Sequence, residues 1–213
     1  QELQFLNVGG EGRVEFWIKL KDDLGAVNNP AIQNKVYLSQ AKEEFINKVN
    51  TKLVIEQKGY FQDEVFGNSG PIPPNAGENT TYTINWQAKN YYNDIRNVKV
   101  KAVLPREVKL TGKIFPEGEA GKFAFDSLSR ELVWEVGEMS AGQGVQNSPP
   151  NISFQVMFTP TASQRGMAAE LIGRAAITGG DQWTKDSIVA IDSAIAADLP
   201  DDNSVSEQQG IVQ

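Results

Sequence analysis

From Thr81 onward the chain consists of eight short runs of β-forming residues, separated by glycine, proline, asparagine and aspartate. The runs are TYTINWQAK, VKVKAVLP, VKLTGKIFP, KFAFD, ELVWEVG, ISFQVMFTP, ELIGRAAIT and SIVAIDSAIA. Apolar side chains alternate along them, as they do in a strand with one buried face. No clear amphipathic helix of ten or more residues interrupts the series. Runs of this length and spacing predict an all-β fold, an immunoglobulin-like (Ig-like) antiparallel β-sandwich.

The core of this sandwich has to form without a disulfide, because the chain contains no cysteine. Trp86 and Trp134 are each in register with the apolar residues of their own runs, which favours a place between the sheets. Stacking on a sugar is the alternative role for these rings. We predict that both are core residues and that burying each contributes about 3 kcal/mol.

The composition removes most catalytic chemistry. With neither histidine nor cysteine, the chain lacks the usual nucleophilic triads and zinc sites. Its net charge of -7 opposes binding to nucleic acid. Asp126, Glu131 and Glu135 are close enough in sequence for glycosidase carboxylates, but alternation places the two glutamates opposite Leu132 and Trp134, toward solvent. We therefore predict no enzymatic activity and no cofactor, with calcium as the one open question.

The first 57 residues also carry strand patterns. KVYLS and TKLVIEQ are typical of short strands, and RVEFWIKL of a half-buried one. AKEEFINKV has apolar residues near the helical period but lacks a stop signal, so we interpret it as extended. The alternation in RVEFWIKL separates Val14, Phe16, Ile18 and Leu20 from Arg13, Glu15, Trp17 and Lys19.

A specific series of motifs begins in YFQDEVFGNSGPIPPNAGENTTYTINWQAKNYYNDIRNVKVKAVLP. There G-P-x-P-P precedes T-T-Y-T-I-x-W and N-x-x-N-D-x-x-N-V-x-V-x-A-x-L-P. Later come L-x-W-E-V-G-x-M-x-A-G-x-G, P-P-x-I-S-F-Q-V and L-P-D-D-x-S-V. In order and spacing these motifs, over about residues 60–205, resemble the membrane-proximal β-sandwich of long envelope-anchored proteins of candidate-phylum bacteria, related to the tandem Ig-like repeats called DUF11.

The resemblance implies a non-catalytic extracellular domain, at the cell surface or anchored to the envelope, beside further Ig-like modules of the same protein. Residues 1–57 are then the C-terminal part of a preceding sandwich, 58–200 a complete sandwich, and 201–213 an acidic tail or linker. The partial module lacks its first half. We favour a chain cut from a longer one over missing strands that a second molecule supplies. Membrane contact is expected only through an anchor outside these residues.

The predicted function is a rigid spacer or adhesive module of a cell-surface protein. Two alternatives stay open: a filament subunit that assembles by strand exchange through the incomplete first module, and a module that binds carbohydrate or protein. The second alternative needs exposed aromatic rings. Its candidates are Trp17 on a polar strand face, Trp183 in the turn-like GGDQW, Tyr91 and Tyr92. For the two tryptophans we favour packing at a sheet edge or between domains over a binding role.

Acidic residues at two places offer the oxygen ligands that calcium prefers. They are Asp63 and Glu64 near the predicted boundary, and Asp198, Asp201 and Asp202 in DLPDD. Their spacing differs from that of an EF-hand loop. A solvated acidic tail is the competing interpretation.

The stretch Gly67–Asn90 joins a proline- and glycine-rich half to an alternating half. Proline blocks unwanted pairing at the edge of a sheet. We interpret the first half as the edge-protected first strand and turn of the complete sandwich, and the second half as its second strand.

Overall fold

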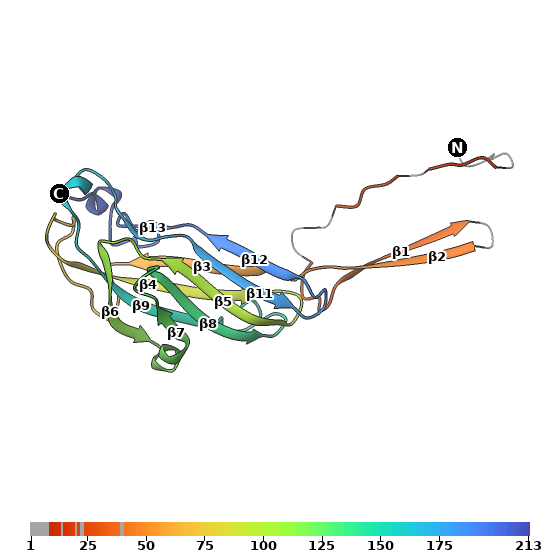
Figure 1. Ribbon diagram of the computed structural model, residues 1–213, viewed down its shortest axis with the longest axis horizontal. Coiled ribbons are helices and arrows are strands. Elements are labelled where there is room, and N and C mark those ends of the chain that lie inside the picture. Colours follow the sequence, from red (N-terminus) through yellow and green to blue (C-terminus); the bar gives the residue numbers. More distant parts are fainter. Residues whose placement is uncertain (1–8, 14, 20, 22–23, 39–40) are drawn as a thin grey trace.

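The computed structural model describes residues 9–13, 15–19, 21, 24–38 and 41–213. A four-stranded and a five-stranded sheet form an antiparallel sandwich (Figure 1), which confirms the predicted all-β fold. The four-stranded sheet has the order β3 (Leu53–Tyr60), β4 (Thr80–Asn90), β9 (Asn151–Phe158) and β6 (Val108–Phe115). The five-stranded sheet has the order β12 (Ser187–Asp192), β11 (Ala175–Asp181), β5 (Ile95–Val103), β8 (Glu131–Met139) and β7 (Phe123–Phe125).

The strand order is that of an Ig domain. β3, β4 and β9 take the places of strands A, B and E, and β12, β11, β5 and β8 those of G, F, C and C′. β6 occupies the place of strand D, although it precedes β8 in the chain. Among the described residues no helix is long and apolar enough to span a membrane. The short elements are β10 (Glu170–Ile172), β13 (Ile195–Ala196), η1 (Glu117–Lys122), η2 (Ala162–Gln164) and η3 (Glu207–Gly210).

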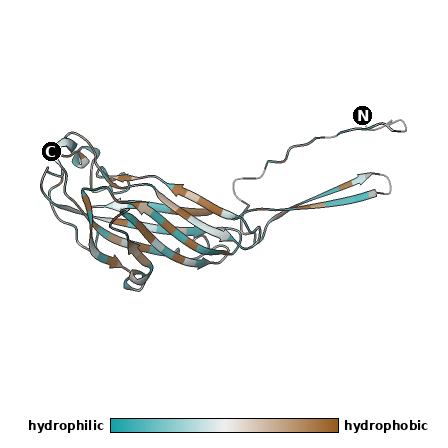
Figure 2. Ribbon diagram, in the orientation of Figure 1, coloured by the Kyte–Doolittle hydropathy of each residue, from teal (hydrophilic) through white to brown (hydrophobic). Residues whose placement is uncertain are grey.

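Aromatic and branched aliphatic side chains fill the space between the sheets, and hydrophobic residues recur along the sandwich strands in Figure 2. Trp86 and Trp134 are both fully buried, which confirms them as core residues. The Trp86 ring meets that of Phe154 edge-on at a centroid distance of 5.0 Å, and its Nε1 donates to Gln57 Oε1 at 2.7 Å. Trp134 Nε1 donates to Glu119 Oε2 at 2.9 Å. Each indole therefore buries its rings while its one donor is satisfied.

The position of β3 corrects the predicted module boundary. β3 pairs with β4 along its whole length. Leu53 and Ile55 on β3 belong to the buried core of the sandwich. The boundary predicted between residues 57 and 58 therefore falls inside a strand of the complete sandwich. Alternation in TKLVIEQ indicates one buried face, but it does not say which sheet covers that face.

Two segments predicted as strands are not strands. The described part of RVEFWIKL, Arg13 and residues 15–19, lies in no strand, while Val14 and Leu20 are outside the described residues. Residues 67–79, which include the proline-rich half, form turns and bends between β3 and β4. A strand needs a neighbour for its backbone hydrogen bonds, and local alternation does not supply one. Here β3 takes the place of the predicted first strand.

The C-terminal segment, residues 201–213, packs on the sandwich and is not a free tail or linker. Val205 and Val212 are buried. The backbone N–H of Gln213 donates to Pro74 O at 2.8 Å. Its acidic composition suggested solvation, but one of its carboxylates, Asp202, is buried and accepts hydrogen bonds from backbone N–H groups of residues 61 and 62.

Replacing Gly210 by alanine is expected to lower the free energy of unfolding by about 1 to 3 kcal/mol. A Cβ at Gly210 would lie 2.3 Å from Asp198 Cα and 2.6 Å from Ala197 O, and backbone atoms cannot rotate away. Gly118 is the matched control, since a Cβ there meets nothing within 4 Å. Urea denaturation of both variants measures the difference. Equal stabilities would contradict the close packing of the C-terminal segment.

Outside the sandwich, β1 (Ala31–Leu38) and β2 (Ala41–Lys48) form a two-stranded antiparallel arm that projects from one end (Figure 1). The strand β2 confirms the extended interpretation of AKEEFINKV. In the part of the chain that the structure describes, the arm pairs with no further strand. Four large apolar side chains of the arm are accordingly between 47% and 66% exposed, namely Val36, Tyr37, Phe45 and Ile46.

Candidate functional site

Four buried polar residues lie where the arm joins the sandwich, and we call them the arm junction: Thr51, Asn90, Asn93 and Asp181. Thr51 lies between β2 and β3. Its backbone N–H donates to Asp181 Oδ2 at 2.8 Å, and its Oγ1 donates to Asn90 Oδ1 at 2.7 Å. The same Oγ1 accepts the backbone N–H of Tyr92 at 2.9 Å. The chain is thus held by buried hydrogen bonds as it leaves the arm.

Asp181, the last residue of β11, is the centre of the arm junction. Besides Thr51, its Oδ2 accepts Asn93 Nδ2 at 2.7 Å, and its Oδ1 accepts the N–H groups of Trp183 and Thr184 at 2.7 and 3.0 Å. Burial by itself raises the pKa of the Asp181 carboxyl, but the hydrogen bonds outweigh it and hold the pKa below its usual range. Asp181 is therefore ionised at neutral pH and holds together the segment between β2 and β3, the β4–β5 turn and the β11–β12 turn.

Trp183 contacts the arm itself. Its Nε1 donates to Pro30 O at 3.2 Å, directly before β1. Lys48 Nζ, at the end of β2, lies 4.2 Å from the centroid of the Trp183 ring and donates to its backbone oxygen at 3.0 Å. This cation–π contact and these hydrogen bonds fix both arm strands against the sandwich.

The other aromatic candidates differ in exposure. Tyr92 is 4% exposed and Tyr91 is half-buried, whereas Trp17 is 87% exposed. The Tyr91 ring meets that of Tyr92 at a tilted angle of 57° and a centroid distance of 5.7 Å, and Lys52 Nζ lies over it at 4.9 Å. These rings therefore do not form one exposed platform. The buried Tyr92 ring counts against a carbohydrate-binding surface built from this set.

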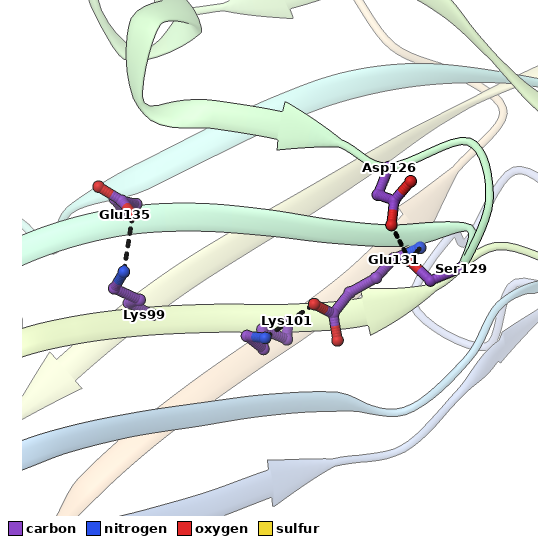
Figure 3. Close-up of polar contacts among 6 residues, drawn as sticks. All are labelled: Lys99, Lys101, Asp126, Ser129, Glu131 and Glu135. Carbon is purple, nitrogen blue, oxygen red and sulfur yellow. Dashed lines mark hydrogen bonds and ion pairs between the residues drawn. The ribbon is translucent and has the colours of Figure 1, made fainter.

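The three carboxylates considered for a glycosidase site form ion pairs or hydrogen bonds with neighbouring side chains (Figure 3). Glu131 accepts from Lys101 Nζ, and Glu135 from Lys99 Nζ, each at 2.7 Å. Asp126 accepts Ser129 Oγ at 2.7 Å and the Leu128 N–H at 3.0 Å, and these bonds lower its pKa. Ion pairs between β5 and β8 on an outer sheet face, and a capped turn, account for all three.

Replacing Glu135 by glutamine is expected to cost less than about 1 kcal/mol, because ion pairs at exposed positions contribute little. Lys99 and Glu135 are 43% and 59% exposed as side chains. Thermal unfolding at low and high salt measures the effect, which salt is expected to diminish. A loss several times larger, unchanged by salt, would contradict the assignment of this pair to a solvated face.

The calcium candidates do not gather at one place in the described chain, where no group of three or more acidic residues is arranged to hold a metal ion. Asp202 Oδ2 accepts the N–H groups of Phe61 and Gln62 at 2.7 and 3.0 Å, and its Oδ1 accepts Ser204 Oγ at 2.6 Å. Asp201 and Asp202 line one hollow, and Asp63 lines the next. Calcium binding by Asp63, Glu64, Asp198, Asp201 or Asp202 stays a prediction.

Sequence reasoning missed the arm junction. Asn90, Asn93 and Asp181 are residue types that favour turns and strand ends, and this is the only local signal. Thr51 and Asp181 are 130 residues apart in sequence. Their pairing depends on the strand order, which local patterns do not contain.

No protein-family model matches the chain. No curated protein matches it either. Among solved structures it is similar to BcpA, the major pilin subunit of Bacillus cereus, at 12% identity and a TM-score of 0.41, over 76% of this chain and 50% of that chain. It is similar to the major pilin SpaD of Corynebacterium diphtheriae at 14% identity and a TM-score of 0.35, over 68% and 35%.

A third similar structure is the mu homology domain of Fcho1 from Danio rerio, at 13% identity and a TM-score of 0.34, over 72% of this chain and 47% of that one. The chain thus spans half or less of each of these three proteins. Similarity at this level assigns neither a family nor a function.

Proposed function

We propose that the chain is a non-catalytic structural or adhesive module of a cell-surface protein and acts as a rigid spacer in a tandem array of Ig-like domains. The supporting observation is the placement of its two ends. The arm projects from one end of the sandwich, and the C-terminus lies at the other (Figure 1). Modules joined in this way form a line. The buried hydrogen bonds of Asp181 give each join a fixed direction.

Distance measurements between two spin labels test this proposal. The chain contains no cysteine, so Gln33→Cys on the exposed arm and Lys109→Cys on β6 accept labels at those two positions alone. A rigid spacer is expected to give one narrow distance distribution in the wild-type background. A broad distribution would contradict rigidity and make the arm a flexible tether.

A filament subunit that assembles by strand addition is the second candidate, because the chain exposes apolar side chains next to unpaired backbone. Phe16 and Ile18 are 64% and 55% exposed outside any strand, and both edges of the arm are open in the described chain. Such edges add strands from other molecules. Light scattering over a wide concentration range distinguishes the two candidates: growing particles support the filament, and a constant monomer excludes it.

A further inference from the structure

The end of the sandwich opposite the arm contains a hollow. The loop between β3 and β4 meets the C-terminal segment there, and together they border an open hollow of about 370 Å³. We call this hollow the far-end pocket. The volume falls in the range of small-molecule sites. Its lining includes the apolar residues Phe61, Ile72 and Val205, and the polar residues Asp63 and Asn68.

Hydrogen bonds hold the wall of the far-end pocket in place. Asn68 Nδ2 donates to Phe61 O at 3.0 Å and to Thr83 Oγ1 at 2.9 Å, while Gln155 Nε2 donates to Asn68 Oδ1 at 2.9 Å. Asp202 accepts the backbone N–H of Phe61 at 2.7 Å. Loop and C-terminal segment are thus both tied to Phe61. A pocket whose walls are fixed in advance loses little entropy on binding.

The lining is negatively charged. A second hollow, lined by Asp201 and Asp202, shares Gln62 and Ser204 with the far-end pocket. Among the described residues, neither hollow is lined by a lysine or an arginine. In the described chain no ion pair joins the lining aspartates to a base. The far-end pocket therefore disfavours anions and attracts cations.

Tyr60 and Lys113 lie beside this negative charge. Burial raises the pKa of Tyr60, Lys58 opposes the rise, and the charges of Asp201 and Asp202 add to it. Lys113 reaches the loop from β6, but its Nζ donates to a backbone oxygen at 3.2 Å. This lysine is thus engaged outside the pocket lining.

Asp63 has an unused acceptor. Its Oδ2 accepts the Phe66 N–H at 2.8 Å and Thr83 Oγ1 at 3.0 Å. In the described residues, no donor reaches Asp63 Oδ1. A carboxylate oxygen beside an apolar wall, with no donor of its own, fits a ligand that brings a charged donor.

We infer that the far-end pocket binds a protonated primary amine carried on an apolar stem, which is the chemistry of a lysine side chain. The stem covers Phe61, Ile72 and Val205, and the ammonium group donates to Asp63. An anion finds no basic partner there, and a neutral polyol leaves the carboxylates without a counter-charge. A ligand at the far-end pocket is an addition to the spacer proposal. The spacer role needs no ligand, so it holds even if the pocket binds nothing.

Titrations with two matched probes test the inference. Capped lysine is acetylated at its α-amine and methylamidated at its carboxyl end, so that its side-chain ammonium group stays free. It is compared with capped norleucine, which has the same stem without the ammonium group. Backbone amide NMR signals of Gly67 and Ser204 report binding at the pocket. Capped lysine is expected to bind about tenfold or more tightly than capped norleucine, as one charge-assisted hydrogen bond provides. Equal binding of both probes, or no shift with lysine, overturns the inference.

Asp63→Asn, with Glu64→Gln as its control, locates the charge responsible. Asparagine keeps an acceptor for the N–H of Phe66, and Glu64 is a neighbouring carboxylate outside the pocket lining. Asp63→Asn is expected to abolish the lysine preference, and Glu64→Gln to keep it. Equal losses in both variants refute a specific site.

Two measurements on the wild-type protein need no variant. Added salt is expected to weaken the binding of capped lysine and to leave the binding of capped norleucine unchanged. Calcium chloride is the competing cation. If calcium shifts the Gly67 and Ser204 signals and capped lysine does not, the pocket is a metal site and the amine inference is wrong. None of these outcomes changes the spin-label distance of the arm, so the spacer proposal is tested separately.

Discussion

Trp86→Ala is expected to lower the free energy of unfolding by about 3 to 5 kcal/mol. Trp86 is fully buried, and its ring packs edge-on against Phe154 and Phe123 at centroid distances of 5.0 and 6.1 Å. Truncation opens a cavity that these neighbours fill only in part. It also removes the Nε1 donor from Gln57, whose Nε2 donates to Gly173 O in the connection between β10 and β11. Denaturant unfolding measures the loss.

Two controls accompany Trp86→Ala, one for the hydrogen bond and one for burial. Trp86→Phe keeps much of the aromatic volume without the donor, and we expect it to lose less than Trp86→Ala. Trp17→Ala removes a ring that is 87% exposed, and its effect is expected to stay within about 0.5 kcal/mol. Comparable losses for Trp17→Ala and Trp86→Ala would overturn the assignment of Trp86 to the core.

Asp181→Ala is expected to cost about 3 kcal/mol or more, because two buried and two part-buried N–H groups lose their acceptor at once. The spin-label distance between arm and sandwich is expected to broaden in this variant. Asp181→Asn is the gentler variant, since its amide keeps one acceptor oxygen and removes the charge. Thermal unfolding and hydrogen exchange at the Thr51 amide measure both. A variant with normal stability and a narrow distance would show that the junction does not direct the arm.

The contribution of Asp181 also depends on pH. Because its pKa is lower in the folded protein than the value of about 3.9 in the unfolded chain, the ionised form stabilises the fold above about pH 4. This stability is lost as the pH falls below that value and through the lowered folded-state pKa. The stability difference between wild type and Asp181→Ala should therefore shrink below about pH 4. A difference that stays constant down to strongly acidic pH would contradict the charge assignment.

Local patterns in the sequence identified the strands and the core. Trp86 and Trp134 were predictable because alternation requires only that one face of each strand be buried, and this requirement is written in neighbouring residues. The outward position of Glu131 and Glu135 follows from the same rule, and their ion pairs with β5 agree with it.

The site was harder to predict than the fold. In the sequence Trp183 and Tyr92 are candidates for a contact surface, with packing favoured for Trp183; in the fold Trp183 contacts the arm and Tyr92 is buried. Asp202 was assigned to an acidic tail, but it holds the backbone of Phe61 from 141 residues away. In each case the deciding partner is distant in sequence, so composition and periodicity carry no information about it.

The sequence by itself determined that this chain is an all-β, aromatic-cored sandwich without histidine or cysteine chemistry. Only the tertiary structure decided that β3 belongs to the complete sandwich, that residues 201–213 close one end of it, and that Asp181 fixes the arm at the other. The reason is physical. Alternation along a strand records which face avoids water, whereas strand order and buried hydrogen bonds depend on which distant segments meet when the whole chain packs.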